Sequence, residues 1–212
     1  MAYRTTPKMA LRKEAHRARL LRTAIRLFGK HGYHATTVPM IVKESGSSTG
    51  SFYFYFRNKE DVFAAALESF GKRIAGALNA AIAAAGDEPL LQMEAAVQRL
   101  VLLMSVNPDE ARILIVESSG LSSRLEQIRR SIIDGHVQSV EQALVSLASV
   151  LPRQDAAVAA RCWVGAVYES VYHWLGQPSN ERCQARTFAT AVSDFNLRGV
   201  GAPARFRTDP PG

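Results

Sequence analysis

The sequence has little of several features that mark particular classes of protein. It contains only two cysteines, Cys162 and Cys183, and their spacing fits no metal or redox motif. This scarcity favours a reducing compartment such as the cytoplasm, and it predicts two inert core thiols rather than a redox pair. The first residues lack the apolar core of a secretory signal, and no apolar run reaches the ~18 residues of a membrane span. A secreted or membrane-embedded protein is therefore not expected.

Motifs for catalysis and for metal binding are also missing. The chain has no Gly-rich phosphate loop, no H-E-x-x-H pair and no recognisable catalytic triad. His136 has no second ligand at metal spacing, so neither a metal site nor a cofactor is predicted. The acidic pairs Asp87–Glu88 and Asp109–Glu110 fall at expected helix starts, where carboxylates favour the helix dipole. An enzyme with a basic appendage is the least favoured interpretation.

The positive charge of the chain is concentrated in its first third. Residues 1–62 hold twelve Lys or Arg and four acidic residues, so their net charge of +8 exceeds the +7 of all 212 residues. A basic module joined to a nearly neutral body is typical of proteins that bind a polyanion, most often nucleic acid. On charge alone, a solvated basic face without a partner is the alternative.

Hydrophobic periodicity predicts helices throughout the chain. A first helix is expected over residues 13–30, where Leu21, Ile25 and Phe28 recur on one face and Gly32 follows as a left-handed C-cap. Gly46 predicts a tight turn between a short second helix and a third. The expected N-caps are Thr36 or Thr37, Ser47 or Ser48, and Asn58, which opens a fourth helix to about residue 85. Further helices are expected at 88–106, 109–118, 122–150, 154–176 and 180–198.

Aromatic residues make up only 8% of the chain, yet five of them, FYFYF, occupy positions 52–56. Alone, this run would favour a β-strand. Because both flanks are helical in pattern, we expect it to straddle the end of the third helix. Phe52 and Phe56, four residues apart, would then face the core, and Tyr53 would point the opposite way.

The segment HRARLLRTAIRLFGKHGYHATTVPMIVKESGSSTGSFYFYFRNKEDVFAAAL resembles the DNA-binding domain of the TetR family of regulators. The shared features, in order, are FGKHGY, ATTV, Ile41, Gly46, S-x-G-S-F-Y-x-Y-F and N-K-E-D before a long helix. The resemblance implies an all-α protein in which an N-terminal three-helix helix-turn-helix domain joins a larger helical domain that binds a ligand and dimerises. The implied boundaries are 1–62 for the first domain, 63–199 for the second and 200–212 for a flexible tail, with 1–12 as a flexible basic arm.

The resemblance also implies which residues contact DNA. The third helix would enter the major groove with its first turn at base edges, and hydroxyl groups and Lys59 would contact phosphates. The implied set is Thr36, Thr37, Ser48, Thr49, Gly50, Ser51, Tyr53, Phe54, Tyr55 and Lys59. The small Thr49 stands where the family often has a longer polar residue, and Ser47 and Pro39 also depart from its pattern. Four basic residues, Arg4, Lys8, Arg12 and Lys13, form either a DNA-binding arm or a disordered basic segment.

For the second domain, the resemblance implies a homodimer and a small effector. The last two helices are the expected dimer interface, which predicts a palindromic operator. Two stripes are candidates for that contact: Phe188, Val192 and Phe195, and Ala157, Ala160, Val164, Val167 and Val171. The expected effector is hydrophobic or aromatic, and its candidate contacts are Met93, Val97, Leu100, Met104, His136, Trp163, Tyr168 and Tyr172, with ordinary core packing as the alternative.

Two functional hypotheses follow from these patterns. The first is a sequence-specific transcriptional regulator, a repressor that its effector releases from the operator. The second is an architectural DNA-binding protein of low specificity without an effector, whose affinity would fall steeply with salt.

Overall fold

The computed structural model describes residues 7–203, and within that range every regular element is helical, which confirms the all-α class. The first elements are α1 (Pro7–Ala35), α2 (Val38–Ser45), α3 (Thr49–Tyr55) and α4 (Lys59–Ala84). The DNA-binding candidates lie between α1 and α2, at the N-cap of α3 and within it, and at the start of α4. The following elements are α5 (Pro89–Val106), α6 (Pro108–Arg112), the π-helical segment η1 (Ile113–Glu117), α7 (Ser123–Ser146), α8 (Ala156–Gly176) and α9 (Ala185–Gly199).

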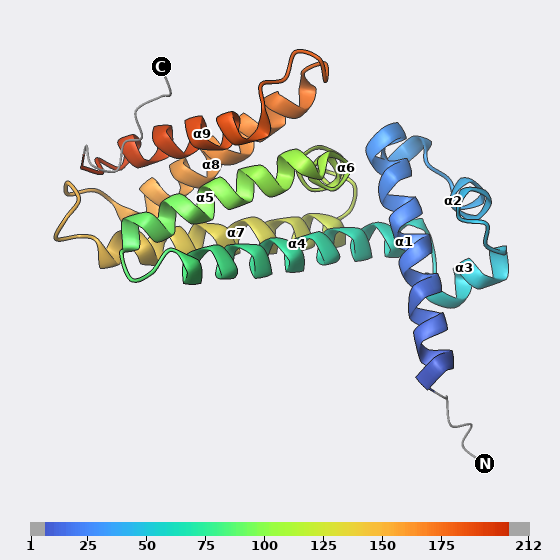
Figure 1. The fold of residues 1–212 in the computed structure, drawn as a ribbon. Coiled ribbons are helices and arrows are strands. Elements are labelled where there is room, and N and C mark those ends of the chain that lie inside the picture. Colours follow the sequence, from blue (N-terminus) through green and yellow to red (C-terminus); the bar gives the residue numbers. More distant parts are fainter. Residues whose placement is uncertain (1–6, 204–212) are drawn as a thin grey trace.

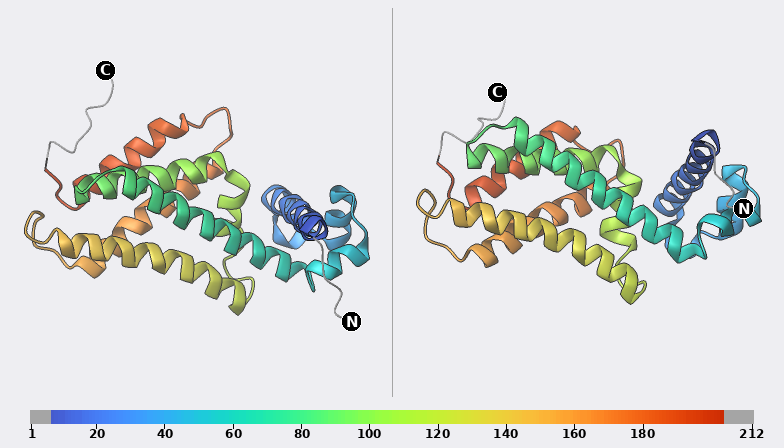
Figure 2. Two further views of the ribbon diagram at one scale, coloured as in Figure 1. Left: turned by 60° about the horizontal axis from the view of Figure 1, so that its bottom comes forward. Right: turned by 90° about the horizontal axis from the view of Figure 1, so that it is seen from below.

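The helices α1 to α3 form a small lobe at one end of the molecule, and α4 runs from that lobe into a larger helical bundle (Figure 1). In the bundle, α5 packs against α4 and α9, and α7 packs against α8 and α4. Figure 2 shows from two further directions that the small lobe lies at one end of the bundle. This arrangement fits an N-terminal helix-turn-helix unit followed by a larger helical unit.

Aromatic and aliphatic side chains from four helices hold the small lobe together. Leu20 and Phe28 from α1, Ile41 from α2, Phe52 from α3 and Phe63 from α4 are all fully buried. The rings of Phe28 and Phe63 pack edge to face with centroids 4.9 Å apart, a favourable aromatic geometry. The lobe core is therefore continuous with the start of α4, so the orientation of α4 is coupled to that of α3.

Two helix boundaries differ clearly from expectation. The first helix begins at Pro7 rather than near residue 13, so residues 7–12 extend the helix and are not a flexible arm. The sequence of residues 7–12 carries no apolar stripe, and Leu11 and Arg12 are exposed, so hydrophobic periodicity does not predict this part of the helix. At the other end, Gly32 has the positive φ expected of a C-cap, at +79°, yet the helical assignment continues beyond it to Ala35.

The expected C-terminal tail is partly structured. Gly201 adopts φ +79°, and the amide of Ala202 donates to the carbonyl of Leu197 at 3.0 Å, closing α9 with a turn that favours glycine. Val200 and Ala202 are buried, so the flexible tail does not begin at residue 200. Residues 204–212 lie outside the described part of the chain.

Helix α5 is long and apolar enough to span a membrane by length and composition. Its position in the bundle explains this composition, because it packs against α4, α8 and α9 and buries Leu90, Val101 and Met104 completely. A helix contacted on several sides is expected to be apolar around most of its circumference.

Candidate nucleic-acid interface and ligand cavity

The helix-turn-helix is built from three local signals in the sequence. Thr37 caps α2 by accepting a hydrogen bond from the amide of Met40 at 3.4 Å. Gly46 then turns the chain in the left-handed conformation, at φ +61° and ψ 34°. Ser48 caps α3 by accepting from the amide of Ser51 at 3.1 Å. These contacts confirm Thr37, Gly46 and Ser48 in the local roles expected from the sequence.

The aromatic run divides between the core and the surface as predicted. Phe52 and Phe56 are 0% and 3% exposed, whereas Tyr53 and Phe54 are 53% and 66% exposed. Two buried rings thus anchor a helix of only seven residues, and its other face stays in solvent. Thr49 and Gly50, in the first turn of α3, are also exposed. The lobe therefore presents one face of α3 that is open to a partner.

His16 connects α1 to the recognition helix, and no sequence pattern pointed to it. Its Nε2 atom lies 2.8 Å from the hydroxyl of Ser51 and 3.1 Å from that of Ser47. Its ring stacks on Tyr55, with the ring centroids 5.7 Å apart. Ser51 and Tyr55, both candidate DNA contacts, are thus engaged inside the lobe, where His16 holds the orientation of α3.

Thr36 is not available to DNA through its side chain. The residue is fully buried, and its hydroxyl donates to the carbonyls of Gly32 at 2.8 Å and Leu27 at 3.2 Å. The expectation of a Thr36 hydroxyl–phosphate contact is therefore wrong in this conformation. The side chain instead satisfies carbonyl groups at the end of α1, which would otherwise lack partners.

Lys59 has a structural role that the sequence did not reveal. Its ammonium group donates to the carbonyl of Tyr33 at 2.7 Å and lies 4.2 Å from the centroid of the Tyr33 ring. Partial burial lowers the pKa of Lys59 from its ordinary value. Lys59, at the start of α4, thus binds a carbonyl near the end of α1. A DNA phosphate that contacted its ammonium group would share that group with the Tyr33 carbonyl.

Other cations of α1 pack on the aromatic run. The Lys13 ammonium lies 5.5 Å from the Phe54 ring centroid, and the Arg17 guanidinium lies 5.3 Å from that of Phe56. Arg12 is exposed on the same helix, so Arg12 and Lys13 have fixed backbone positions. Arg4, and the side chain of Lys8, lie outside the described residues.

The larger lobe contains a cavity of about 620 Å³ between α4, α5, α7 and α8. Five of the eight expected ligand contacts line it: Met93, Val97, Leu100, His136 and Trp163. Met104 does not, because it is fully buried in the packing of α5. A volume of this size lies within the usual range for small-molecule sites.

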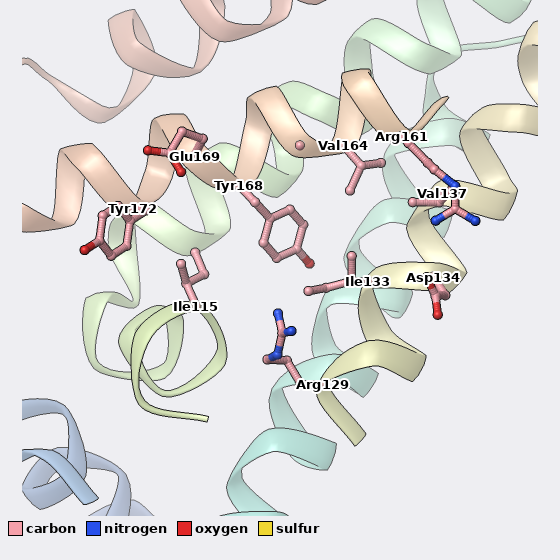
Figure 3. A pocket seen from close by; sticks show the side chains of 11 residues that line it. Ile115, Arg129, Ile133, Asp134, Val137, Arg161, Val164, Tyr168, Glu169 and Tyr172 are labelled. Atoms are coloured by element: carbon pink, nitrogen blue, oxygen red, sulfur yellow. The ribbon is translucent and has the colours of Figure 1, made fainter. Parts of the chain in front are cut away.

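The two remaining candidates, Tyr168 and Tyr172, line a second, more polar pocket of about 410 Å³ between η1, α7 and α8 (Figure 3). Arg129, Asp134, Arg161 and Glu169 contribute charged groups to its wall. Val164 lines both spaces, and the hydroxyl of Tyr168 lies 3.0 Å from Nδ1 of His136. Burial lowers the pKa of His136 to about 4, so its imidazole is neutral near pH 7.

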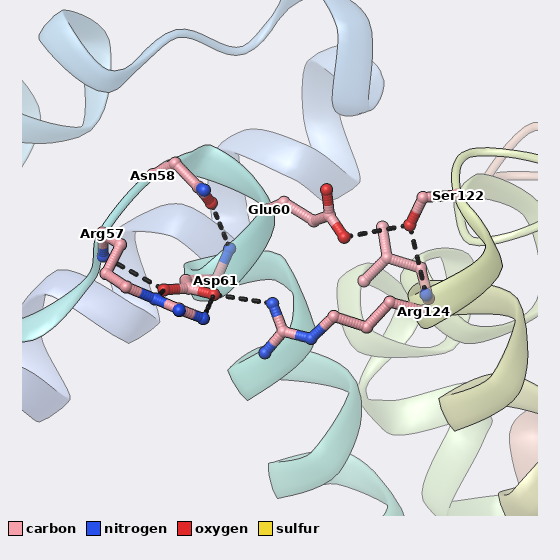
Figure 4. A network of polar contacts seen from close by, with 7 residues as sticks. Arg57, Asn58, Glu60, Asp61, Ser122 and Arg124 are labelled. Atoms are coloured by element: carbon pink, nitrogen blue, oxygen red, sulfur yellow. Dashed lines mark hydrogen bonds and ion pairs between the residues drawn. The ribbon is translucent and has the colours of Figure 1, made fainter.

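Polar contacts join the small lobe to the bundle beside α3 (Figure 4). Asp61, in the first turn of α4, pairs with Arg57 at 2.6 Å and with Arg124 of α7 at 2.6 Å. The hydrogen bonds from Arg57 and Arg124 hold the pKa of Asp61 well below its ordinary value. Ser122, the N-cap of α7, donates to the carboxylate of Glu60 at 3.0 Å.

Glu117 makes a second connection between the lobes, through the π-helical segment. Its carboxylate accepts a hydrogen bond from the backbone amide of Tyr33 at 2.9 Å. The contact falls where α1 bends at Gly32, and it uses the last residue of η1. Glu117 therefore connects the two lobes at their junction.

The expected dimer stripe of α8 faces the protomer's own core. Its residues Ala160, Val164, Val167 and Val171 are all buried without a partner chain, and on α9 Val192 is buried as well. The exposed face of α8 instead carries Val158, Cys162, Gly165, Glu169 and Tyr172 at helical spacing.

Two of the candidate dimer contacts are exposed, as a contact with a partner protomer requires. They are Ala157 of α8 and Phe195 of α9, which is 64% exposed. Phe188 stacks on Trp174, with ring centroids 5.7 Å apart.

Cys162 and Cys183 are exposed free thiols, so the expectation of core thiols is wrong. Among the described residues, no group of three or more His, Cys, Asp or Glu could hold a metal ion.

A short helix-turn-helix on a basic lobe, joined through α4 to a bundle with a cavity, is the architecture of a ligand-responsive DNA-binding protein. The sequence profile of the family described as "Bacterial regulatory proteins, tetR family" matches residues 20–66. The chain is 49% identical over 57 residues to the uncharacterised regulator YxaF of Bacillus subtilis, covering 26% of this chain and 30% of YxaF. It is 44% identical over 52 residues to YerO of the same organism, covering 24% of this chain and 18% of YerO.

Solved structures resemble the chain over most of its length. The MbdR regulator of Azoarcus sp. CIB is 26% identical with a TM-score of 0.75, covering 87% of this chain and 98% of MbdR. The regulator FadR of Bacillus subtilis, solved in complex with stearoyl-CoA, is 18% identical with a TM-score of 0.70, covering 86% and 98%. The helix-turn-helix match thus shows a TetR-family DNA-binding domain over residues 20–66, and the solved structures show that the chain as a whole has the fold of TetR-family regulators. The chain spans less than a third of the length of the curated relatives named above.

Proposed function

We propose that the protein is a transcriptional regulator that binds double-stranded DNA through α3. The observation that carries this proposal is the division of α3, whose rings Phe52 and Phe56 are buried while Thr49, Gly50 and Tyr53 are exposed. An exposed recognition helix on a lobe rich in Lys and Arg fits the major groove, where phosphate contacts position the helix and base edges specify the site. Such a regulator would act in the cytoplasm.

Thr37, Ser48, Thr49, Gly50, Tyr53 and Phe54 are the proposed DNA contacts on the exposed surface. Thr49 and Gly50 are small, so their readout of base edges would depend on close approach of the backbone and on DNA shape. The hydroxyl of Tyr53 is proposed to bind a phosphate, as is the N-terminus of α2 at Thr37. Ser51, Tyr55 and Lys59 contribute mainly by holding α3 and α4 in place.

We propose a twofold dimer that reads a palindromic operator. Val158 and Tyr172, on the exposed face of α8, and Phe195 of α9 supply exposed apolar side chains for a partner protomer. A symmetric dimer places two copies of α3 on successive major grooves, one helical turn of DNA apart. The proposed domains are the helix-turn-helix lobe and the bundle, which meet along α4.

The proposed regulation is repression relieved by a hydrophobic effector in the cavity. The cavity wall is largely apolar, and the related FadR was solved with stearoyl-CoA, which supports an aliphatic or aromatic ligand. Helix α4 lines the cavity with Gly71, Ala75 and Leu78, and it begins next to α3. A ligand that favours one position of α4 would change the spacing of the two recognition helices and weaken operator binding. An architectural protein without an effector has no use for such a cavity.

The first test is selection of binding sites from random duplex DNA at physiological salt, followed by sequencing. An enriched palindrome is the expected result, whereas binding without enrichment would favour the architectural alternative. On the selected operator, Tyr53→Phe should weaken binding at least about tenfold, since a hydrogen bond to a charged group contributes about 1.5–3 kcal/mol. Thr187→Ala, at an exposed position of α9, is the control. Equal affinities of wild type and Tyr53→Phe would remove the Tyr53 hydroxyl from the DNA contacts.

A further inference from the structure

The wall of the 620 Å³ cavity carries no side chain that is charged near neutral pH. Its 23 lining residues include no Lys, Arg, Asp or Glu, and His136 is the only residue among them with a titratable side chain. Most of the wall is aliphatic or aromatic, with Met93, Leu100 and Trp163 from α5 and α8. Apart from His136 and the indole of Trp163, the polar side chains of the wall carry hydroxyl or amide groups. A ligand in this space therefore meets no counterion for either sign of charge.

Charged groups line the neighbouring pocket, which shares Val164 of α8 with the cavity. Arg129 makes two hydrogen bonds to Glu126, at 2.7 and 3.0 Å, and is thereby already paired. Arg161 lines that pocket together with one acidic residue of each helix, Asp134 of α7 and Glu169 of α8. Charge is thus present close by but is kept out of the cavity wall.

His136 provides one directional contact in this apolar space. Its Nδ1 atom is occupied by the Tyr168 hydroxyl at 3.0 Å, and its Nε2 atom has no hydrogen-bond partner among the described residues. If Tyr168 donates to Nδ1, Nε2 carries the hydrogen and donates to a ligand; if Nδ1 donates, Nε2 accepts. A hydroxyl or primary amide group on a ligand satisfies either arrangement, because both groups donate and accept.

We propose that the cavity binds an uncharged, mainly apolar molecule whose single hydroxyl or amide group hydrogen-bonds to Nε2 of His136. This inference rests on the proposed function, since it names the chemical class of the effector. Burying an unpaired carboxylate or ammonium group costs far more than burying a hydrogen-bonded hydroxyl. The cavity should therefore discriminate by charge among ligands of one shape.

Calorimetric titration with three probes that share one chain tests the charge selection. The probes are 1-decanol, decanoate and decylammonium, each titrated into the full chain at pH 7.5. We expect 1-decanol to bind at least tenfold more tightly than either ion. Equal or tighter binding of decanoate or decylammonium would overturn the inference. It would indicate instead an effector with an apolar chain and a charged group.

A second titration tests the role of His136 with 2-naphthalenemethanol and naphthalene, which differ by the hydroxymethyl group. In His136→Phe, the affinity for 2-naphthalenemethanol should fall about tenfold, and that for naphthalene should change by less than threefold. Ser131→Ala, at another polar position of the wall, is the matched control. An equal loss for both probes would show that the substitution reshapes the cavity, which would overturn the hydrogen-bond assignment.

The outcome for DNA binding separates this inference from the proposed function. If none of the five probes binds while the selected operator still does, the ligand inference and the effector part of the proposed function both fail, and the DNA-binding part stands. If a neutral probe binds but no operator can be selected, the cavity assignment stands and the regulator proposal fails. Release of the operator by 1-decanol but not by decanoate would support both.

Discussion

Acidification should destabilise the folded protein through His136, and the size of the effect follows from its environment. Burial lowers the pKa of His136 from its ordinary value of 6.5 to about 4. Between these values the unfolded chain binds a proton that the folded chain excludes, so stability is fully present above pH 6.5 and falls as the pH decreases. At pH 5.0, 1.5 pH units below the unfolded value, the loss is about 2 kcal/mol. Below pH 4 the loss levels off at about 3.4 kcal/mol.

Urea denaturation at pH 7.5 and pH 5.0 measures this loss, with His136→Gln as the variant. Glutamine stays neutral and can still contact the Tyr168 hydroxyl, so the variant should lack the His136 part of the pH dependence. Other groups titrate as well: Asp61 and Glu126 have lowered pKa values, and Glu94 and Asp109 have raised ones. Their effects are common to both proteins and cancel in the difference.

The expected result is that wild type loses about 2 kcal/mol more than His136→Gln between the two pH values. His173→Gln, which removes an exposed histidine from α8, is the control and should behave as the wild type does. Identical pH dependence of wild type and His136→Gln would mean that the folded protein protonates His136 as readily as the unfolded chain. The cavity around it would then be hydrated, and the reasoning from burial would be refuted.

Three further predictions concern α3 and the dimer. Phe52→Ala should lower the free energy of unfolding by about 3–5 kcal/mol and the exposed Phe54→Ala by less than about 0.5 kcal/mol, measured by urea denaturation; equal losses would contradict the division of the aromatic run. His16→Ala should weaken operator binding about tenfold in fluorescence anisotropy, since it removes partly buried hydrogen bonds to Ser51 and Ser47; unchanged affinity would show that α3 is held without it. Phe195→Arg should shift the protein towards monomer in sedimentation, whereas Val106→Arg, equally exposed on α5, should not.

The parts of the small lobe that follow from local rules could be predicted from the sequence. Capping by Thr37, Ser48 and Asn58 depends on residues three positions apart, and the left-handed turn at Gly46 depends on one residue. The burial of Phe52 and Phe56 follows from helical spacing alone. Helical periodicity and turn-forming residues are therefore sufficient to predict these features.

The features that failed depend on contacts between distant segments. His16 and Ser51 are 35 positions apart, and Glu117 and Tyr33 are 84 apart, so no spacing rule brings them together. The same holds for Lys59, whose ammonium group donates to the carbonyl of Tyr33, 26 positions earlier. Thr36 is different, because its hydroxyl is occupied by carbonyls of α1 only four and nine positions earlier. The stripe of α8 was assigned to a partner chain because periodicity identifies an apolar face but not what covers it.

Helices α4 and α7 carry the physical connection between the cavity and the DNA-binding lobe. At the cavity, Gly71 of α4 lies so close to Ile132 of α7 that a Cβ atom there would stand 2.8 Å from its Cδ1 atom. At the other end, the same two helices are joined beside α3 by the pairing of Asp61 with Arg124. Under the proposed regulation, a ligand in the cavity would press on helices that cannot approach each other further, and close-packed helices are expected to respond by shifting as units. Because the far ends of α4 and α7 are linked, we expect such a shift to reach the start of α4 and, with it, the orientation of α3.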